Sequence, residues 1–303
     1  MHQPHRITTI DYAGHSCLQL RSAHGTATIS LHGAQLLSWV PTGQSEVFWL
    51  SPEALPEPAA IRGGVPVCWP WFASQGMPIG AMAHGPVRTR LWNVTATDTG
   101  DTSDGAGTDQ PLCVTLIPKP GLSPEDPLCR YASGLQVSLR VELSHTLTQT
   151  LTTHNLGEQP FVLTQALHSY FAVTDVSQVQ ISGLENQPYA CKLSGAQNAS
   201  HPGIWQLDQA CDRVYQQNCA STQRRYTLSD PAAGRQIHIT THGSQSVVVW
   251  NPGAETAAKM ADVPDRAWHD FVCIEVANAG ADRINLAPGG QYALTQTIAV
   301  TND

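Results

Sequence analysis

A strict two-residue alternation of apolar and polar side chains is the feature that most limits what this chain can fold into. Between residues 135 and 144 every odd position holds Leu or Val, and every even position holds Gln, Ser, Arg or Glu. Because successive side chains of a β-strand point to opposite faces, this segment predicts a long antiparallel strand with one buried and one wet face. We expect its partner strand to begin near Phe161, after a turn at 155–157.

Shorter segments of the same kind recur along the chain, and no segment has the pattern of an amphipathic helix of ten or more residues. Residues 98–110, rich in Asp, Gly, Thr and Ser, predict a solvated hairpin loop. Alternation resumes in the same style on both sides of that loop, so we expect a single domain over residues 1–303. Regular strands without helical crossovers predict an all-β fold, a β-sandwich. The further strands are expected at 6–12, 16–21, 25–31, 34–40, 91–97, 111–117, 236–241, 246–251, 271–276 and 291–300.

Charge and hydropathy exclude several classes of function. The 303 residues carry a formal net charge of -8, which argues against non-specific nucleic-acid binding, because such binding uses Lys and Arg to neutralise phosphates. No apolar run approaches the roughly 20 residues that span a bilayer, and the first six residues lack the apolar segment of a signal peptide. Eight cysteines lie without any C-x-x-C pair, which favours free thiols and a cytoplasmic protein. We expect a monomer.

Two segments in the first third of the chain interrupt the alternation. Residues 61–72 combine Arg62, a pair of glycines and several aromatic side chains, including Trp71. Glycines let a backbone approach a ligand closely, and aromatic faces are surfaces on which sugar rings stack. Residues 83–88 place His84 and Arg88 around a glycine, a pattern suited to a loop that presents donors to an oxygen-rich ligand. A buried aromatic corner and a loop-capping histidine are the alternative interpretations.

Two later segments each hold one group that can carry a proton. His168 follows a predicted strand, and histidine is the side chain best suited to give and take protons near neutrality. Glu275 interrupts an otherwise apolar strand, where a carboxylate is unfavourable without a partner. A satisfied core histidine and a paired structural glutamate are the alternatives. A polar residue inside an apolar strand nonetheless indicates a functional site.

Taken together, these segments resemble the aldose 1-epimerase superfamily, and most closely its hexose-6-phosphate 1-epimerase branch. The resemblance extends from about residue 25 to residue 300. The motifs in this sequence are Gly33-Ala34-Gln35-Leu36-Leu37-Ser38-Trp39, the Arg62 to Phe72 loop, His84-Gly85 with Arg88, Leu167-His168-Ser169-Tyr170-Phe171, Val249-Trp250-Asn251-Pro252, Met260-Ala261-Asp262 and Cys273-Ile274-Glu275.

The resemblance implies a galactose-mutarotase-like β-supersandwich, no cofactor, no metal and a sugar phosphate as substrate. It implies that His168 is the general acid and Glu275 the general base. His84 would contact the sugar, and Arg62 and Arg88 would bind the 6-phosphate.

We add Trp71 and Lys192 to the expected substrate-binding residues. Two positions depart from the family pattern. Cys191 stands where an Asp is usual, and the family's His-Gly-Phe-Ala-Arg reads His84-Gly85-Pro86-Val87-Arg88 here.

The expected reaction is the interconversion of the α and β anomers of a hexose 6-phosphate, glucose 6-phosphate above all. Opening the ring removes a proton from the anomeric hydroxyl and adds one to the ring oxygen, so an acid and a base must act together. The alternatives are a neutral-aldose mutarotase and a non-catalytic sugar-binding or regulatory protein. A cupin-type metal isomerase is disfavoured because no H-x-H motif with a following Glu occurs, and a glycosidase needs two opposed carboxylates.

Overall fold

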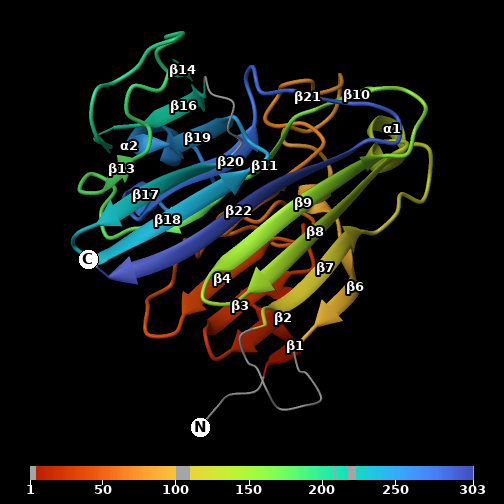
Figure 1. Ribbon diagram of the computed structural model, residues 1–303, viewed down its shortest axis with the longest axis horizontal. Helices are drawn as coiled ribbons and strands as arrows, with labels where there is room; N and C mark the ends of the chain where they lie inside the picture. The colour runs from red at the N-terminus through yellow and green to blue at the C-terminus, as the bar shows by residue number, and fades with distance from the viewer. Residues whose placement is uncertain (1–4, 100–109, 208, 218–222, 303) are drawn as a thin grey trace.

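Strands dominate the part of the chain that the computed structural model describes, which is residues 5–99, 110–207, 209–217 and 223–302 (Figure 1). The largest sheet has nine strands, in the spatial order β15 (Trp205–Gln206), β13 (Gln180–Ser182), β17 (Arg224–Asp230), β18 (Arg235–His242), β22 (Gln291–Asn302), β9 (Leu147–Asn155), β8 (Leu135–Leu143), β7 (Leu112–Pro118) and β6 (Trp92–Asp98).

A second sheet has seven strands, four of which have only two or three residues. Its spatial order is β14 (Tyr189–Cys191), β16 (Cys211–Gln216), β19 (Ser246–Asn251), β20 (Phe271–Asn278), β11 (Gln165–Leu167) and β5 (Val67–Cys68), and β12 (Tyr170–Ala172) also pairs with β20. A third sheet contains β1 (Arg6–Tyr12), β2 (His15–Ser22), β3 (Gly25–Ser30) and β4 (Leu36–Pro41). The remaining elements are the pair β10 (Phe161–Leu163) and β21 (Ile284–Leu286), the α-helices α1 (Pro127–Tyr131) and α2 (Gly253–Ala257), and the 3₁₀ turns η1 (Val87–Thr89) and η2 (Ala267–His269).

One large apolar core joins these three sheets. It includes Leu139 and Leu151 from the nine-stranded sheet, Trp39 from the four-stranded sheet, and Ile274 and Val276 from the seven-stranded sheet. Figure 1 shows the long strands β8, β9 and β22 lying in front of β2, β3 and β4. Stacking these sheets removes one apolar face of each from water, which is the main favourable term in folding. The predicted all-β sandwich is therefore confirmed.

The ten further strands expected from the sequence all occur, with ends that differ by two residues or fewer. The predicted partner of the strand at 135–143 was wrong, however. This strand, β8, pairs with β9, whereas Phe161 begins β10, which pairs with β21. The inward-facing positions of β9 include Gln149 and Thr153, both fully buried, and these polar residues conceal the apolar alternation.

The predicted hairpin around 98–110 is consistent with the antiparallel pairing of β6 and β7, although residues 100–109 lie outside the described part of the chain. The two α-helices in the described ranges have five residues each, and no helix there is long and apolar enough to cross a membrane. Seven cysteines are described and all are free thiols; Cys219 lies outside the described residues. A single domain stays a prediction.

Candidate active site

A cavity of about 160 Å³, which we call the inner cavity, opens on one face of the seven-stranded sheet. The alternation of β20 explains its position. Val272, Ile274 and Val276 point into the main core, so Glu275 must point to the opposite face. The lining residues are Arg62, Phe72, Ala73, His84, His168, Tyr170, Lys192, Asp212, Val248, Trp250 and Glu275.

His168 reaches Glu275 because the strand beside β20 is interrupted. β11 pairs with residues 276–278 of β20 and β12 pairs with residues 271–273, which leaves His168 and Ser169 beside Glu275. The hydroxyl of Ser169 donates to Gln296 in the core, 3.0 Å away, and this turns the neighbouring His168 toward the cavity. His168 Nε2 lies 3.4 Å from Glu275 Oε1.

Burial pushes both members of this pair toward their neutral forms. The pKa of Glu275 is raised well above its usual range, because burial removes solvation from the carboxylate and because the Asp212 carboxylate is near. The pKa of His168 is lowered well below its usual range by burial, and then by His84 and the charge of Arg88. Both shifts favour the neutral forms, so the 3.4 Å approach of the two side chains is better described as a contact between neutral groups than as an ion pair.

His84 is held as a neutral hydrogen-bond donor. The amide of Ala73 donates to His84 Nδ1 at 3.3 Å, so the ring hydrogen belongs on Nε2. Burial, assisted by the charge of Arg88, lowers the pKa of His84 to about 3. The next residue must be glycine, because a Cβ at Gly85 would lie 1.8 Å from the carbonyl oxygen of Trp69.

Arg62 is fixed at the edge of the inner cavity by two partners. Its Nε donates to Asp262 Oδ2 and its Nη1 donates to the hydroxyl of Tyr170, each at 2.9 Å. Tyr170 in turn stacks on the ring of His168, with 4.9 Å between ring centroids. Arg62 therefore stands on the His168 side of the His168–Glu275 pair, and only part of its guanidinium is left for a ligand.

Lys192 and Asp212 close the other side of the inner cavity. Lys192 Nζ lies 3.3 Å from Asp212 Oδ1, and the amide of Lys192 donates to the carbonyl of Asp212 at 2.9 Å. Sequence reasoning missed Asp212, because one acidic residue in an ordinary strand resembles a solvated position. The strand that pairs with the segment of Cys191 is β16, and it supplies a carboxylate to the cavity through Asp212.

Two of the predicted substrate-binding residues lie outside the cavity lining. Trp71 is buried and donates through its indole nitrogen to the carbonyl of Met82 at 2.9 Å, so it braces a loop instead of offering a free face. Arg88 lies in η1. Its Nε is buried without a hydrogen-bond partner among the described residues. Its charge nevertheless lowers the pKa of both His84 and His168.

Comparison with known proteins identifies the class. The family model for aldose 1-epimerase matches residues 16–299, so this chain belongs to the aldose 1-epimerase family. It is an isomerase of the epimerase type. Within the described residues, no group of three or more His, Cys, Asp or Glu side chains could hold a metal ion.

Individual relatives narrow the resemblance. A protein of Salmonella typhimurium, provisionally named glucose-6-phosphate 1-epimerase, is 34% identical over 279 residues, which are 90% of this chain and 86% of the relative. An Escherichia coli protein with the same provisional name is 35% identical over 260 residues, 84% of this chain and 80% of that protein.

Solved structures agree with the fold. The crystal structure of a provisionally assigned mutarotase from Salmonella typhimurium has a TM-score of 0.82 at 28% identity, and the match covers 98% of this chain and 94% of that one. Galactose 1-epimerase from Lactobacillus acidophilus has a TM-score of 0.71 over 100% of this chain and 99% of its own, at 13% identity. The predicted galactose-mutarotase-like β-supersandwich is therefore confirmed.

Proposed function

We propose that this protein interconverts the α and β anomers of a hexose 6-phosphate, with glucose 6-phosphate as the principal substrate. The observation that carries the proposal is the contact between His168 and Glu275 inside a small cavity that three cationic side chains surround or approach. The provisional names of the Salmonella and Escherichia relatives support the same substrate.

His168 and Glu275 supply the two proton transfers that ring opening needs. The His168 imidazolium gives a proton to the ring oxygen while the Glu275 carboxylate takes the proton of the anomeric hydroxyl. Glu275 Oε2 is buried without a hydrogen-bond partner in the described part of the chain, which supports its use for that hydroxyl. Rotation about C1–C2 then exposes the other face of the carbonyl group. Ring closure returns both protons and leaves the opposite anomer.

The starting charge state requires a proton shift within the pair. Before substrate binds, a proton belongs on Glu275, because burial raises the pKa of its carboxyl group. A phosphate dianion near His168 favours its protonated form, and the 3.4 Å contact offers a direct route from Oε1 to Nε2. Substrate binding therefore prepares the acid and the base in one step.

The arginines support the phosphate preference. Arg62 lines the inner cavity on the His168 side. Arg88 has no ion pair among the described residues, and its buried Nε lacks a partner there, so this cation is available to an anion. Guanidinium groups bind phosphate oxygens in pairs, which matches a dianion. Asp262 already neutralises part of the charge of Arg62, so we expect the positive charge of Arg88 to add to the attraction that Arg62 supplies.

An NMR exchange assay on glucose 6-phosphate and on glucose tests this function. Arg62→Ala and Arg88→Ala should each lower kcat/KM for glucose 6-phosphate by roughly 10- to 150-fold, the effect of losing a charge-assisted hydrogen bond. Glucose makes no such contact, so its slower exchange should hardly change. Equal losses on both substrates, with a wild type that favours neither, would identify a neutral-sugar mutarotase instead.

The setting of the protein is part of the same proposal. We assign it to the cytoplasm, as a monomer that works without a cofactor or a metal ion. The seven described free thiols support a reducing compartment.

A further inference from the structure

A second and larger cavity, which we call the outer cavity, adjoins the inner one. Its volume is about 580 Å³, within the range of ordinary ligand sites. Phe72, Ala73 and Lys192 line both cavities, so a molecule in the inner cavity can extend past Lys192 into the outer one. The reaction described above makes no use of this space.

The strand register gives the direction from one cavity to the other. Glu275 lies beside Val248 and Val214 in one row across β20, β19 and β16, and Gln216 lies one row further along. Same-face rows are roughly 7 Å apart, because each residue advances a strand by about 3.4 Å. Val214 and Gln216 line the outer cavity. Tyr170, which binds Arg62, lies in the row on the other side of Glu275, opposite Cys273.

This arrangement orients a hexose 6-phosphate. The proposed phosphate end points toward Arg62, on the His168 side. In a pyranose ring, C2 and C3 lie on the side opposite C5 and C6. When the anomeric carbon lies at the catalytic pair, the C2–C3 edge therefore faces Lys192 and the outer cavity.

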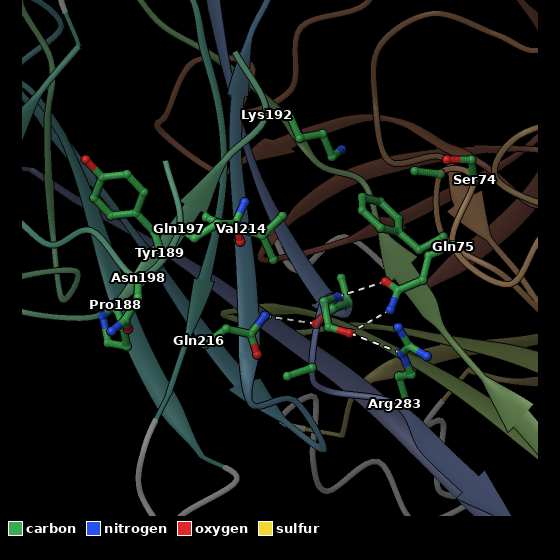
Figure 2. A pocket seen from close by; sticks show the side chains of 16 residues that line it. Ser74, Gln75, Pro188, Tyr189, Lys192, Gln197, Asn198, Val214, Gln216 and Arg283 are labelled. Carbon is green, nitrogen blue, oxygen red and sulfur yellow. Dashed lines mark hydrogen bonds between the residues drawn. The ribbon is translucent and has the colours of Figure 1, made fainter. Parts of the chain in front are cut away.

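The lining of the outer cavity indicates which substituent it accepts. Figure 2 shows Gln75 and Arg283 on one side and Tyr189, Gln197 and Asn198 on the other, with Val214 and Gln216 between them. Gln75 and Gln216 are fixed by hydrogen bonds to the backbone at 279–280, and the Gln216 amide oxygen remains able to accept. Amide groups of this kind bind a neutral amide through paired donors and acceptors.

The charge of the outer cavity further restricts which substituents of the sugar it can accept. Lys192 and Arg283 line it, whereas no Asp or Glu appears among its described lining residues, although the protein carries a net charge of -8. A positively charged substituent would meet Arg283 and Lys192 there, and the carboxylate beside Lys192, Asp212 of the inner cavity, is already paired with that lysine. A neutral acyl-amino group avoids this repulsion.

We propose that the outer cavity receives a substituent at C2 of the sugar, so that the enzyme also interconverts the anomers of 2-acetamido-2-deoxyhexose 6-phosphates. This proposal rests on the proposed function, because it uses the same catalytic pair and the same phosphate position. The substrate class is thereby widened from plain hexose 6-phosphates to their N-acylated 2-amino counterparts.

Three substrates in the NMR exchange assay test the proposal: glucose 6-phosphate, N-acetylglucosamine 6-phosphate and glucosamine 6-phosphate. The acetamido sugar should have a kcat/KM within about threefold of that of glucose 6-phosphate, since its extra group fits without strain. The ammonium sugar should fall by about 10-fold or more, because it meets Lys192 and Arg283. No exchange of glucose 6-phosphate would overturn the proposed function itself. Exchange of glucose 6-phosphate without the acetamido sugar would overturn only the outer-cavity proposal.

A substitution at the exposed rim of the outer cavity tests the role of that cavity without changing the inner one. Ala281 lines the outer cavity but not the inner one, and it is exposed, so a larger side chain there should not unfold the protein. Ala281→Trp should lower kcat/KM for the acetamido sugar by about 10-fold while leaving glucose 6-phosphate within about twofold. Ala281→Ser is the matched control and should change neither. Equal losses on both substrates would overturn the proposal.

Discussion

The nine-stranded and seven-stranded sheets both bury ionisable side chains, but they treat them differently. In the nine-stranded sheet, both carboxylate oxygens of Asp230 accept hydrogen bonds, Oδ2 from the amide and hydroxyl of Thr174 and Oδ1 from the amide of Ala233. In the seven-stranded sheet, Glu275 and His168 contact each other, and each keeps one buried polar atom without a hydrogen-bond partner among the described residues. The structural carboxylate of Asp230 is fully bonded on folding, whereas the proposed catalytic groups keep capacity for a substrate.

Strand length determines where a buried side chain can keep a polar atom available to a substrate. β8, β9 and β22 pair continuously over eight or nine residues, and a long ladder leaves little freedom for a side chain to leave its alternating position. β11 and β12 have three residues each, and the break between them frees His168. The continuous nine-stranded sheet therefore supports the fold, and the interrupted seven-stranded sheet holds the candidate site.

The largest effect expected from this contrast is on activity. Glu275→Gln and His168→Ala should each reduce anomer exchange of glucose 6-phosphate by at least about 100-fold, the contribution of one placed proton carrier. Circular dichroism should show an unchanged fold. Asp230→Asn is the counterpart in the other sheet, and it should lower the thermal midpoint while keeping the catalytic rate. A wild-type rate for either site variant would remove that residue from the mechanism.

The pH dependence of exchange should respond to neighbours of the pair. Activity requires one proton on the pair, so the acidic limb of kcat/KM, which reports the free enzyme, follows His168 and should lie below pH 6.5, because the pKa of His168 is lowered. Arg88→Met removes a nearby positive charge, which raises the pKa of His168 and moves that acidic limb to higher pH. The phosphate of the substrate also titrates, but it does so equally in the assays of the wild type and of Arg88→Met. An unmoved limb would show that Arg88 does not act on His168.

Asp212 should affect the basic limb of the curve of exchange rate against pH. Its carboxylate raises the pKa of Glu275, so Asp212→Asn should lower that pKa and shift the basic limb to lower pH. The comparison uses rate against pH at saturating glucose 6-phosphate. A basic limb that stays in place would mean that another group holds the proton.

A smaller effect is expected on stability. His84 has a pKa of about 3 when folded and an ordinary value near 6.5 when unfolded. The unfolded state therefore binds the extra proton first, and stability should fall as pH falls from 6.5 toward 3. His84→Gln should flatten this part of the curve of thermal midpoint against pH, by several degrees. His238 on β18 is less buried and less shifted, so His238→Gln should flatten it less, and the reverse order would contradict the burial argument.

Removal of metal ions should leave the activity unchanged. Proton transfer between His168, Glu275 and the sugar uses no Lewis acid in this mechanism. Activity should therefore survive exhaustive dialysis against EDTA. Loss of activity that a divalent ion restores would favour a metal-dependent isomerase.

The fold was largely predictable from the sequence because period-two alternation is a local property. The prediction of the partner strand failed because buried polar residues stand at apolar positions of the pattern, as Gln149 and Thr153 do in β9. Partners remote in sequence bond these side chains in the core: Gln149 Oε1 accepts from Gln296, and Thr153 accepts from the indole of Trp69. No local pattern contains such contacts.

The candidate site was predictable where a residue type was out of place. Arg62, His84, His168 and Glu275 line one cavity, and each had been expected from its unusual neighbours. Asp212 gave no such signal, since its role comes from the pairing of β16 with β19.

Trp71 gave a misleading signal of another kind. Its aromatic ring suggested a sugar platform, whereas the structure uses its indole nitrogen to hold the carbonyl of Met82. Orientation, not residue type, decides between these roles.

The most direct measurement is two-dimensional NMR exchange spectroscopy of glucose 6-phosphate with a catalytic amount of the wild-type protein, beside glucose at the same concentration. We predict cross-peaks between the α and β anomeric protons that grow in proportion to the protein, are stronger for the phosphate, and vanish with Glu275→Gln. Exchange of glucose 6-phosphate no faster than in buffer alone would contradict the proposed function.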